Sequence, residues 1–242
     1  ISYNILYKMK KNLNQKLISL IEYYNLINAN LLISNKPLKR IISKKSFTFS
    51  GTKSEKLTKL KDKIKLIKNC DLKKNANNIV FSDGNMNAKI MIIGEGPGAN
   101  EDAAGTPFIG RAGKLLDKML LSIQLDRRKV YITNVVNYRP PENRKPNDEE
   151  IARYLPYLNS HIEIVNPKII LLLGSTALNT LIGDEEVISK ARGKWMQKEI
   201  GSSKTWVISS FHPAFLMRQP EQKKLAWIDL KMIRAKSKDL KI

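Results

Sequence analysis

The chain has 242 residues, 42% of them hydrophobic, which suits one globular domain with a full core and an extension. No run of about 18 apolar residues is present, and Cys70 is the only cysteine, so the sequence excludes a transmembrane helix, an internal disulfide and an all-cysteine metal site. The formal net charge is +21, and residues 1–80 hold 18 Lys/Arg against 4 Asp/Glu, a balance that attracts phosphate backbones but also follows from a composition rich in Lys, Ile and Asn.

Residues 1–60 are expected to form a basic, mostly helical N-terminal extension, and residues 61–242 the main domain. Apolar residues recur at helical spacing in 13–32 and again in 52–68, which predicts one helix in each segment. The start of the chain lacks the apolar stretch and cleavage site of a secretory signal, so we expect a cytoplasmic protein.

From residue 79 onward, short apolar runs alternate with longer amphipathic segments. The runs 89–93, 130–135, 169–173 and 205–209 predict buried strands, and the segments 112–123, 148–165, 176–182 and 221–236 predict helices. Continuous apolar strands separated by helices indicate a parallel sheet that is covered on both faces. Ligands of such sheets bind beyond the carboxyl ends of the strands, so the residues that follow each strand are the candidate site.

The first strand is followed by GEGPGANED over 94–102 and then by GTPFIGRAG over 105–113. Glycines allow tight turns and close approach of a ligand to the main chain. A phosphate cradle would rarely carry Glu95, Glu101 and Asp102. These acids indicate a neutral ligand, or chemistry at a sugar carbon that gains positive charge.

Polar residues also follow the second and fourth strands. Asn134 has one acceptor and two donors, which match the O4 and N3–H edge of uracil, although a strand-end cap is an equal reading of this position. The loop after it is rigid, exposed and basic, and suits phosphate contacts through Arg139, Arg144 and Lys145, or is an ordinary solvated turn. His212 lies in SFHPA just past the fourth strand, where a functional role is favoured over a structural one.

Taken together, GEGPGANED, GTPFIGRAGKLLD, YITNVVNYRPPENRKP, PKIILLLG and SSFHPAF resemble the family 4 uracil-DNA glycosylases over roughly residues 65–235. The resemblance implies a three-layer α/β/α sandwich with a central four-stranded parallel sheet. It implies an enzyme, a hydrolase that flips uracil out of DNA and cuts its N-glycosidic bond, leaving an abasic site for base excision repair. Uracil-containing DNA is the expected partner, and a monomer is expected.

The resemblance also assigns roles residue by residue. Phe108 would stack on the base, Asn134 would read its Watson–Crick edge, and Glu101 would stand near C5. Gly96 belongs to the same pocket, as do Glu95 and Asn143, either of which would position the water. His212 would donate a hydrogen bond to uracil O2. The catalytic set is thus Glu95, Asn143 and His212, and the uracil-binding set is Gly96, Glu101, Phe108 and Asn134.

One part of the family pattern is missing. Members normally hold an iron–sulfur cluster through four cysteines, and the corresponding positions here are Ile67, Cys70, Tyr138 and Tyr154. Cys70 alone cannot hold a cubane cluster, so the sequence predicts no cofactor and no metal. The cluster would tie the segment before the first strand to the Asn143 loop, and Tyr138 and Tyr154 are expected to pack in its place.

Two other readings stay open at this stage. The first is a DNA-binding relative that lost activity together with the cluster, although the retained acids, Phe108, Asn134 and His212 argue against such decay. The second is a nucleotide-binding enzyme that uses the glycine loop for phosphate. The chain lacks GxxxxGK[ST], and its loop carries the wrong charge for that reading.

Overall fold

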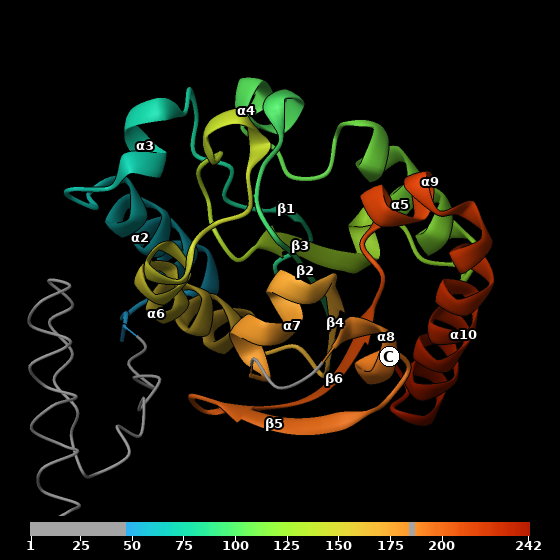
Figure 1. Cartoon of the computed structure of the whole chain (residues 1–242). Helices are drawn as coiled ribbons and strands as arrows, with labels where there is room; N and C mark the ends of the chain where they lie inside the picture. The colour runs from blue at the N-terminus through green and yellow to red at the C-terminus, as the bar shows by residue number, and fades with distance from the viewer. Residues whose placement is uncertain (1–46, 184–186) are drawn as a thin grey trace, which may run out of the picture. The chain divides into compact units, whose positions relative to one another are not determined.

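The computed structural model describes residues 47–183 and 187–242, and the helix predicted over 13–32 lies outside them. In the described part the sheet has six strands in the order β1-β3-β2-β4-β6-β5 (Figure 1). The strands are β1 (Asp83–Gly84), β2 (Ile90–Gly94), β3 (Val130–Asn134), β4 (Ile169–Leu173), β5 (Met196–Ile200) and β6 (Ser203–Ser210).

The four central strands, β3, β2, β4 and β6, are parallel to one another, which confirms the predicted parallel sheet. Two further strands extend it. β1 pairs antiparallel with β3, and β5 pairs antiparallel with β6. The four-strand prediction was therefore correct for the centre of the sheet and missed both edges.

Helices cover both faces of the sheet. They are α2 (Lys53–Lys65), α3 (Asp71–Asn75), α4 (Ala99–Ala104), α5 (Arg111–Leu121), α6 (Asp148–Val165), α7 (Ser175–Leu181), α8 (Ile188–Ala191), α9 (Pro213–Arg218) and α10 (Lys223–Asp239), with short 3-10 turns η1 (Arg127–Lys129), η2 (Pro141–Asn143) and η3 (Pro220–Gln222).

Alternation along each strand divides the core in two. Met91 and Ile93 of β2 face a cluster formed with α2, α6 and α7. Ile90 and Ile92 face the opposite cluster, formed with α5, α9 and α10. Because successive side chains of a strand point to opposite faces, a run that is apolar throughout requires two covering layers, and the predicted α/β/α sandwich is confirmed.

The predicted extension meets the domain in α2. Leu57, Leu60 and Ile64 of this helix are buried in the cluster shared with α6, and Thr52 begins the helix with a capping box completed by Glu55. The boundary predicted at residue 61 therefore falls inside α2. Residues 53–65 belong to the covering layer of the sheet.

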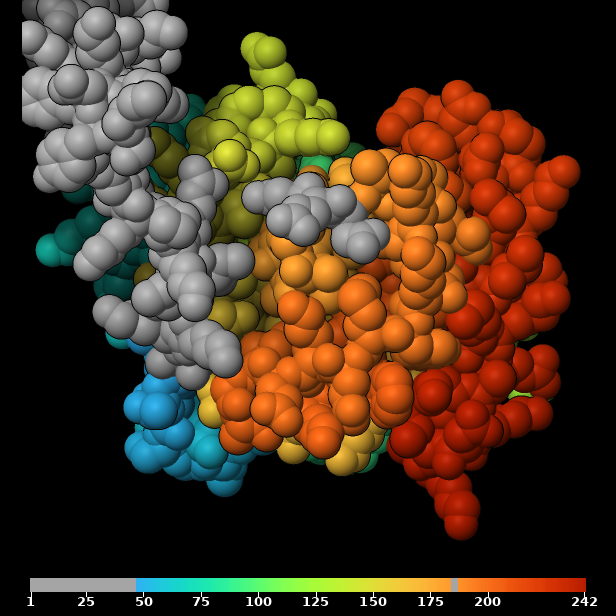
Figure 2. All heavy atoms as spheres, turned by 60° about the horizontal axis from the view of Figure 1, so that its bottom comes forward, coloured from blue at the N-terminus to red at the C-terminus, as the bar shows by residue number. Residues whose placement is uncertain are grey.

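The β5 edge of the sheet is open to solvent over part of its length. In Figure 2 the orange residues of β5 and the adjoining segments lie between the blue start of the described chain and the red α10. The first four residues of β5 alternate between partly buried and exposed, and only Ile200 is buried, in contrast to the continuously buried strand β2. No helix that the structure describes is long and apolar enough to cross a membrane.

Candidate active site

A cavity of about 550 Å³ lies at the carboxyl ends of the parallel strands, where the sequence places the candidate residues. Nine of the ten predicted site residues line it. They are Glu95, Gly96, Glu101, Phe108, Asn134, Asn143, Arg144, Lys145 and His212. The tenth, Arg139, contacts the cavity through Asn143, whose Oδ1 accepts a hydrogen bond of 2.8 Å from Arg139 Nε. The rule that ligands bind beyond the strand ends therefore predicted which segments meet at this cavity.

Glu95 follows β2 directly and is held by a residue of α7. The Thr176 hydroxyl donates a hydrogen bond to Glu95 Oε2, which fixes one carboxylate oxygen of a residue that lines the cavity. Gly96 lies beside Val136, and a Cβ at Gly96 would come within 2.8 Å of Val136 Cγ2. The main chain therefore passes close to its neighbours here, and a larger residue would have to displace either Val136 or the backbone.

Glu101 organises the two glycine-rich segments around the cavity. Its Oε1 accepts from the Ile109 and Gly110 N–H groups at 3.0 and 2.7 Å, and its Oε2 accepts from the Gly98 N–H at 3.2 Å. Gly98 and Gly110 precede α4 and α5, so one carboxylate caps two helix starts. The side chain also lines the cavity, where the resemblance puts it near uracil C5.

Phe108 and His212 are neighbours in the wall of the cavity. Their ring centroids are 5.6 Å apart with planes inclined by 32°. The His212 Nδ1 accepts a hydrogen bond of 3.2 Å from the Ala214 N–H. The ring proton of a neutral imidazole must then reside on Nε2, which makes His212 a donor toward the cavity.

The surroundings favour this neutral form of His212. Burial lowers the pKa of its imidazole to about 4; the nearby Arg218 acts in the same direction, while Glu101 opposes it. The ring is therefore uncharged at neutral pH and donates a hydrogen bond without carrying a full positive charge.

Asn134 ends β3 at the bottom of the cavity. The side chain is only 3% exposed, and its Oδ1 is buried with no hydrogen-bond partner among the described residues. It lies against Gly94, whose missing Cβ leaves room for both Asn134 Oδ1 and the Phe108 ring. A buried acceptor without a partner costs roughly 1–3 kcal/mol. Asn179 Oδ1, Thr205 Oγ1 and Ser209 Oγ are in the same state, but of these four residues only Asn134 lines the cavity, where a ligand can supply a donor.

The basic loop is held by contacts that the sequence did not predict. Arg144 donates two hydrogen bonds to the Glu150 carboxylate, at 2.8 and 2.6 Å, and Glu150 also closes the capping box of α6 with Asn147. Glu142 and Asn143 both have positive φ, which turns the loop sharply at the mouth of the cavity. Lys145 lines the same mouth and is exposed. Positive charge that could bind a phosphate is thus present at the mouth, although Glu150 partly neutralises that of Arg144.

Sequence reasoning missed three residues that shape the site. Thr176 lies two residues beyond Gly174, which follows β4, so the strand-end rule that found Asn134 would also have found it. Arg218, at the end of α9, lines the cavity near His212. Arg127 contacts the Phe108 turn from η1, and its position before β3 gives no such signal.

The side chains at the four positions that correspond to the cluster-binding cysteines of the family are packed together. Tyr138 and Tyr154 are 5% and 0% exposed, as the sequence predicted for two replacements that occupy this space. Cys70 is buried beside them, with its Sγ 3.4 Å from the Tyr154 hydroxyl, and Ile67 packs against the same cluster.

Comparison with known proteins identifies this arrangement. The sequence profile of the Uracil DNA glycosylase superfamily matches residues 81–231. The Type-4 uracil-DNA glycosylase of Thermotoga maritima is 42% identical over 171 residues, covering 69% of this chain and 86% of the relative. The enzyme of the same name from Pyrobaculum aerophilum is 44% identical over 162 residues, covering 64% of this chain and 83% of the relative.

The relatives correct the prediction that no cofactor belongs to the chain. They are type-4 enzymes, a family that carries a [4Fe–4S] cluster, so the prediction is wrong at the level of the family. The side chains at the corresponding place do not fit a cubane cluster, because its four thiolates are represented by one thiol, two phenols and an isoleucine. In the ranges 47–183 and 187–242, no three His, Cys, Asp or Glu side chains group as metal ligands.

Proposed function

This chain belongs to the uracil-DNA glycosylase superfamily, and from its type-4 relatives and its pocket we propose that it hydrolyses the N-glycosidic bond between uracil and deoxyribose in DNA. The product is an abasic site, the substrate of base excision repair. A base inside a duplex does not reach such a cavity, so the uracil nucleotide is flipped out of the stack, at a cost of a few kcal/mol.

The observation that carries this proposal is the buried Oδ1 of Asn134, an acceptor without a partner among the described residues. The N3–H of uracil supplies the missing donor, and the amide nitrogen of the same side chain donates to uracil O4. Cytosine has no N3–H and presents an amino group at position 4, so with the Asn134 amide in this orientation it would leave Oδ1 unpaired. Buried groups left unpaired are the strongest means of discrimination between similar ligands.

Phe108 and His212 bind the other parts of the base. Stacking on the Phe108 ring contributes roughly 1–3 kcal/mol. As the bond between C1′ and N1 breaks, its electron pair leaves on uracil, and negative charge gathers on O2. The neutral His212 donates its Nε2–H to that oxygen, as a donor in an oxyanion hole does.

Of Glu95 and Asn143, Glu95 is the better candidate for positioning the attacking water. Thr176 fixes its Oε2, and the second oxygen remains for a water molecule and for the positive charge that develops on the sugar. The Oδ1 of Asn143 instead accepts from Arg139. The water oxygen bonds to C1′, and its proton passes to the Glu95 carboxylate.

The basic mouth of the pocket fits the phosphates that flank the flipped nucleotide. Lys145, Arg144 and Arg139 are the phosphate contacts in this proposal. The proposal requires only one chain, since the residues that it uses at the pocket come from a single chain. The proposed cytoplasmic location agrees with relatives that are uracil-DNA glycosylases, enzymes that act where DNA is present.

The test uses a labelled DNA strand with one uracil, a matched strand with thymine, and alkali to cleave abasic sites. Cleavage at uracil only, lost in Asn134→Ala and kept in Asn87→Ala, is the expected result. Asn87 is the control because it receives the same substitution at an exposed turn outside the cavity. No cleavage by folded protein that still binds DNA would instead favour a non-catalytic relative. Equal cleavage of the thymine strand would refute the assigned specificity.

A further inference from the structure

Phe108, the residue that stacks on uracil in the proposed function, has an unusual backbone. Its φ is +55°, in the left-handed region that residues other than glycine rarely adopt. Such a conformation persists only where the surroundings hold it. Its side chain is 5% exposed, so a change of this turn would move a large ring that forms one wall of the cavity.

The N–H groups after Phe108 are held from one side. Glu101 accepts from the Ile109 and Gly110 N–H groups, as described above. Gly113 then allows the chain to pack tightly, since a Cβ there would come within 1.6 Å of the Phe108 carbonyl oxygen. These contacts fix the chain that leaves the turn, but they do not hold the carbonyl groups on its other side.

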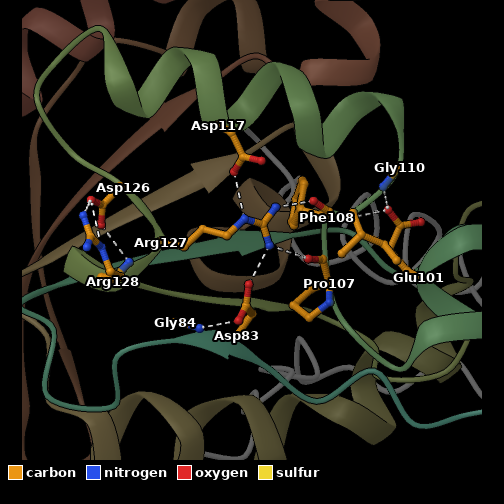
Figure 3. Close-up of polar contacts among 11 residues, drawn as sticks. Asp83, Gly84, Glu101, Pro107, Phe108, Gly110, Asp117, Asp126, Arg127 and Arg128 are labelled. Carbon is orange, nitrogen blue, oxygen red and sulfur yellow. Dashed lines mark hydrogen bonds and ion pairs between the residues drawn. The ribbon is translucent and has the colours of Figure 1, made fainter.

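Those carbonyl groups are bound by Arg127. Its Nη1 donates to the Pro107 carbonyl at 3.1 Å, and its Nη2 donates to the Phe108 carbonyl. Two carboxylates hold the guanidinium in place: Asp83 Oδ2 lies 2.6 Å from Nη1, and Asp117 Oδ1 lies 2.8 Å from Nε (Figure 3). The planar fork of arginine serves all four acceptors at once, whereas a lysine ammonium has three donors and no fixed plane.

Arg127 does not line the cavity and touches no residue assigned to substrate chemistry except through the backbone of Phe108. We propose that Arg127 is a positioning residue for uracil excision: its guanidinium clamps the Pro107 and Phe108 carbonyls and so sets the ring that stacks on the flipped base. This role rests on the proposed function, and it places a determinant of base binding outside the pocket.

The test is a double-mutant cycle with two readouts. Arg127→Met is combined with Phe108→Ala, and Arg128→Met is the control, because Arg128 is the neighbouring arginine, is 89% exposed and pairs with Asp126. We expect Arg127→Met to lower kcat/KM on uracil-containing DNA at least tenfold, and to lower it less than twofold when Phe108 is already alanine. Arg128→Met should change kcat/KM less than twofold.

The second readout is amide hydrogen exchange of residues 105–113 in the free protein. We expect exchange there to become at least tenfold faster in Arg127→Met and to stay unchanged in Arg128→Met. If Arg127→Met does not fold, Arg127→Lys replaces it, because lysine keeps the charge and loses the fork.

The outcomes separate this inference from the function on which it rests. Equal losses of kcat/KM with and without the Phe108 ring, or unchanged exchange over 105–113, would overturn the role of Arg127. Wild-type protein that excises no uracil would overturn the proposed function, while faster exchange in the variant would still support the clamp.

Discussion

Replacing Thr176 by valine tests how the proposed water-binding carboxylate is held. The substitution exchanges a hydroxyl for a methyl group of nearly the same size at a site that is 9% exposed, so packing is largely preserved. What is lost is the hydrogen bond from the Thr176 hydroxyl to Glu95 Oε2. A hydrogen bond to a charged acceptor contributes about 1.5–3 kcal/mol.

At about 1.4 kcal/mol for each factor of ten, that loss corresponds to a fall in kcat of about 10-fold to 150-fold. KM should change little, because Glu95 acts on the water and the sugar cation, which matter in the transition state. Single-turnover excision of uracil from a labelled strand measures the chemical step directly.

Thr180→Val is the matched control. Its hydroxyl donates to the Thr176 carbonyl within α7, at 2.7 Å, and is likewise buried, but it does not contact Glu95. A second check is Glu95→Gln, in whose background Thr176→Val should cost much less. The reasoning fails if Thr176→Val keeps kcat within twofold of wild type, or if Thr180→Val loses as much.

Three further predictions follow from buried groups. His212→Ala should lower kcat about 10²–10³-fold. Wild-type kcat should show no step near pH 6.5, because burial lowers the pKa of His212 to about 4, and a pH–rate profile with such a step would contradict the neutral donor. Burial also lowers the pKa of His161 to about 3, so the folded protein binds fewer protons than the unfolded chain below pH 6.5. The free energy of unfolding should therefore fall by about 3 kcal/mol from this group between pH 7 and pH 4, and urea titrations of His161→Leu should show a smaller fall. Tyr154→Ala should cost about 3–5 kcal/mol of unfolding free energy, since this ring is 0% exposed, and a loss below 1 kcal/mol would show that it is not packed as described.

The sequence predicted the centre of the fold because the central strands are apolar on both faces. The edge strands carry no such signal. β1 has two residues, and β5 reads MQKEI, so neither shows an apolar run or a clear alternation. Burial of both faces requires a continuous apolar run, which can be recognised in the sequence, whereas an edge strand need not be apolar on both faces.

The same contrast holds for the site. Glu95, Asn134 and His212 were predictable because each follows a strand that the sequence shows. Arg127 was not, because its partners come from residues 10 to 44 positions away and only the folded chain brings them together. Arg144 was predicted as a phosphate contact from its place in a basic loop, but its ion pair with Glu150 gave no signal in the sequence, because that contact forms only when the loop folds back on the start of α6.

The two ends of the sheet also bear on how copies of this chain behave at high concentration. An open sheet edge is a template for adding strands from another molecule, and natural proteins protect such edges by shortening them or by placing charge on them. Here β1 offers only two residues, and β5 carries the exposed Gln197 and Glu199 beside Lys198. Neither edge invites a further strand, so the described domain should resist edge-to-edge aggregation even though its centre is built from continuous runs of isoleucine and leucine.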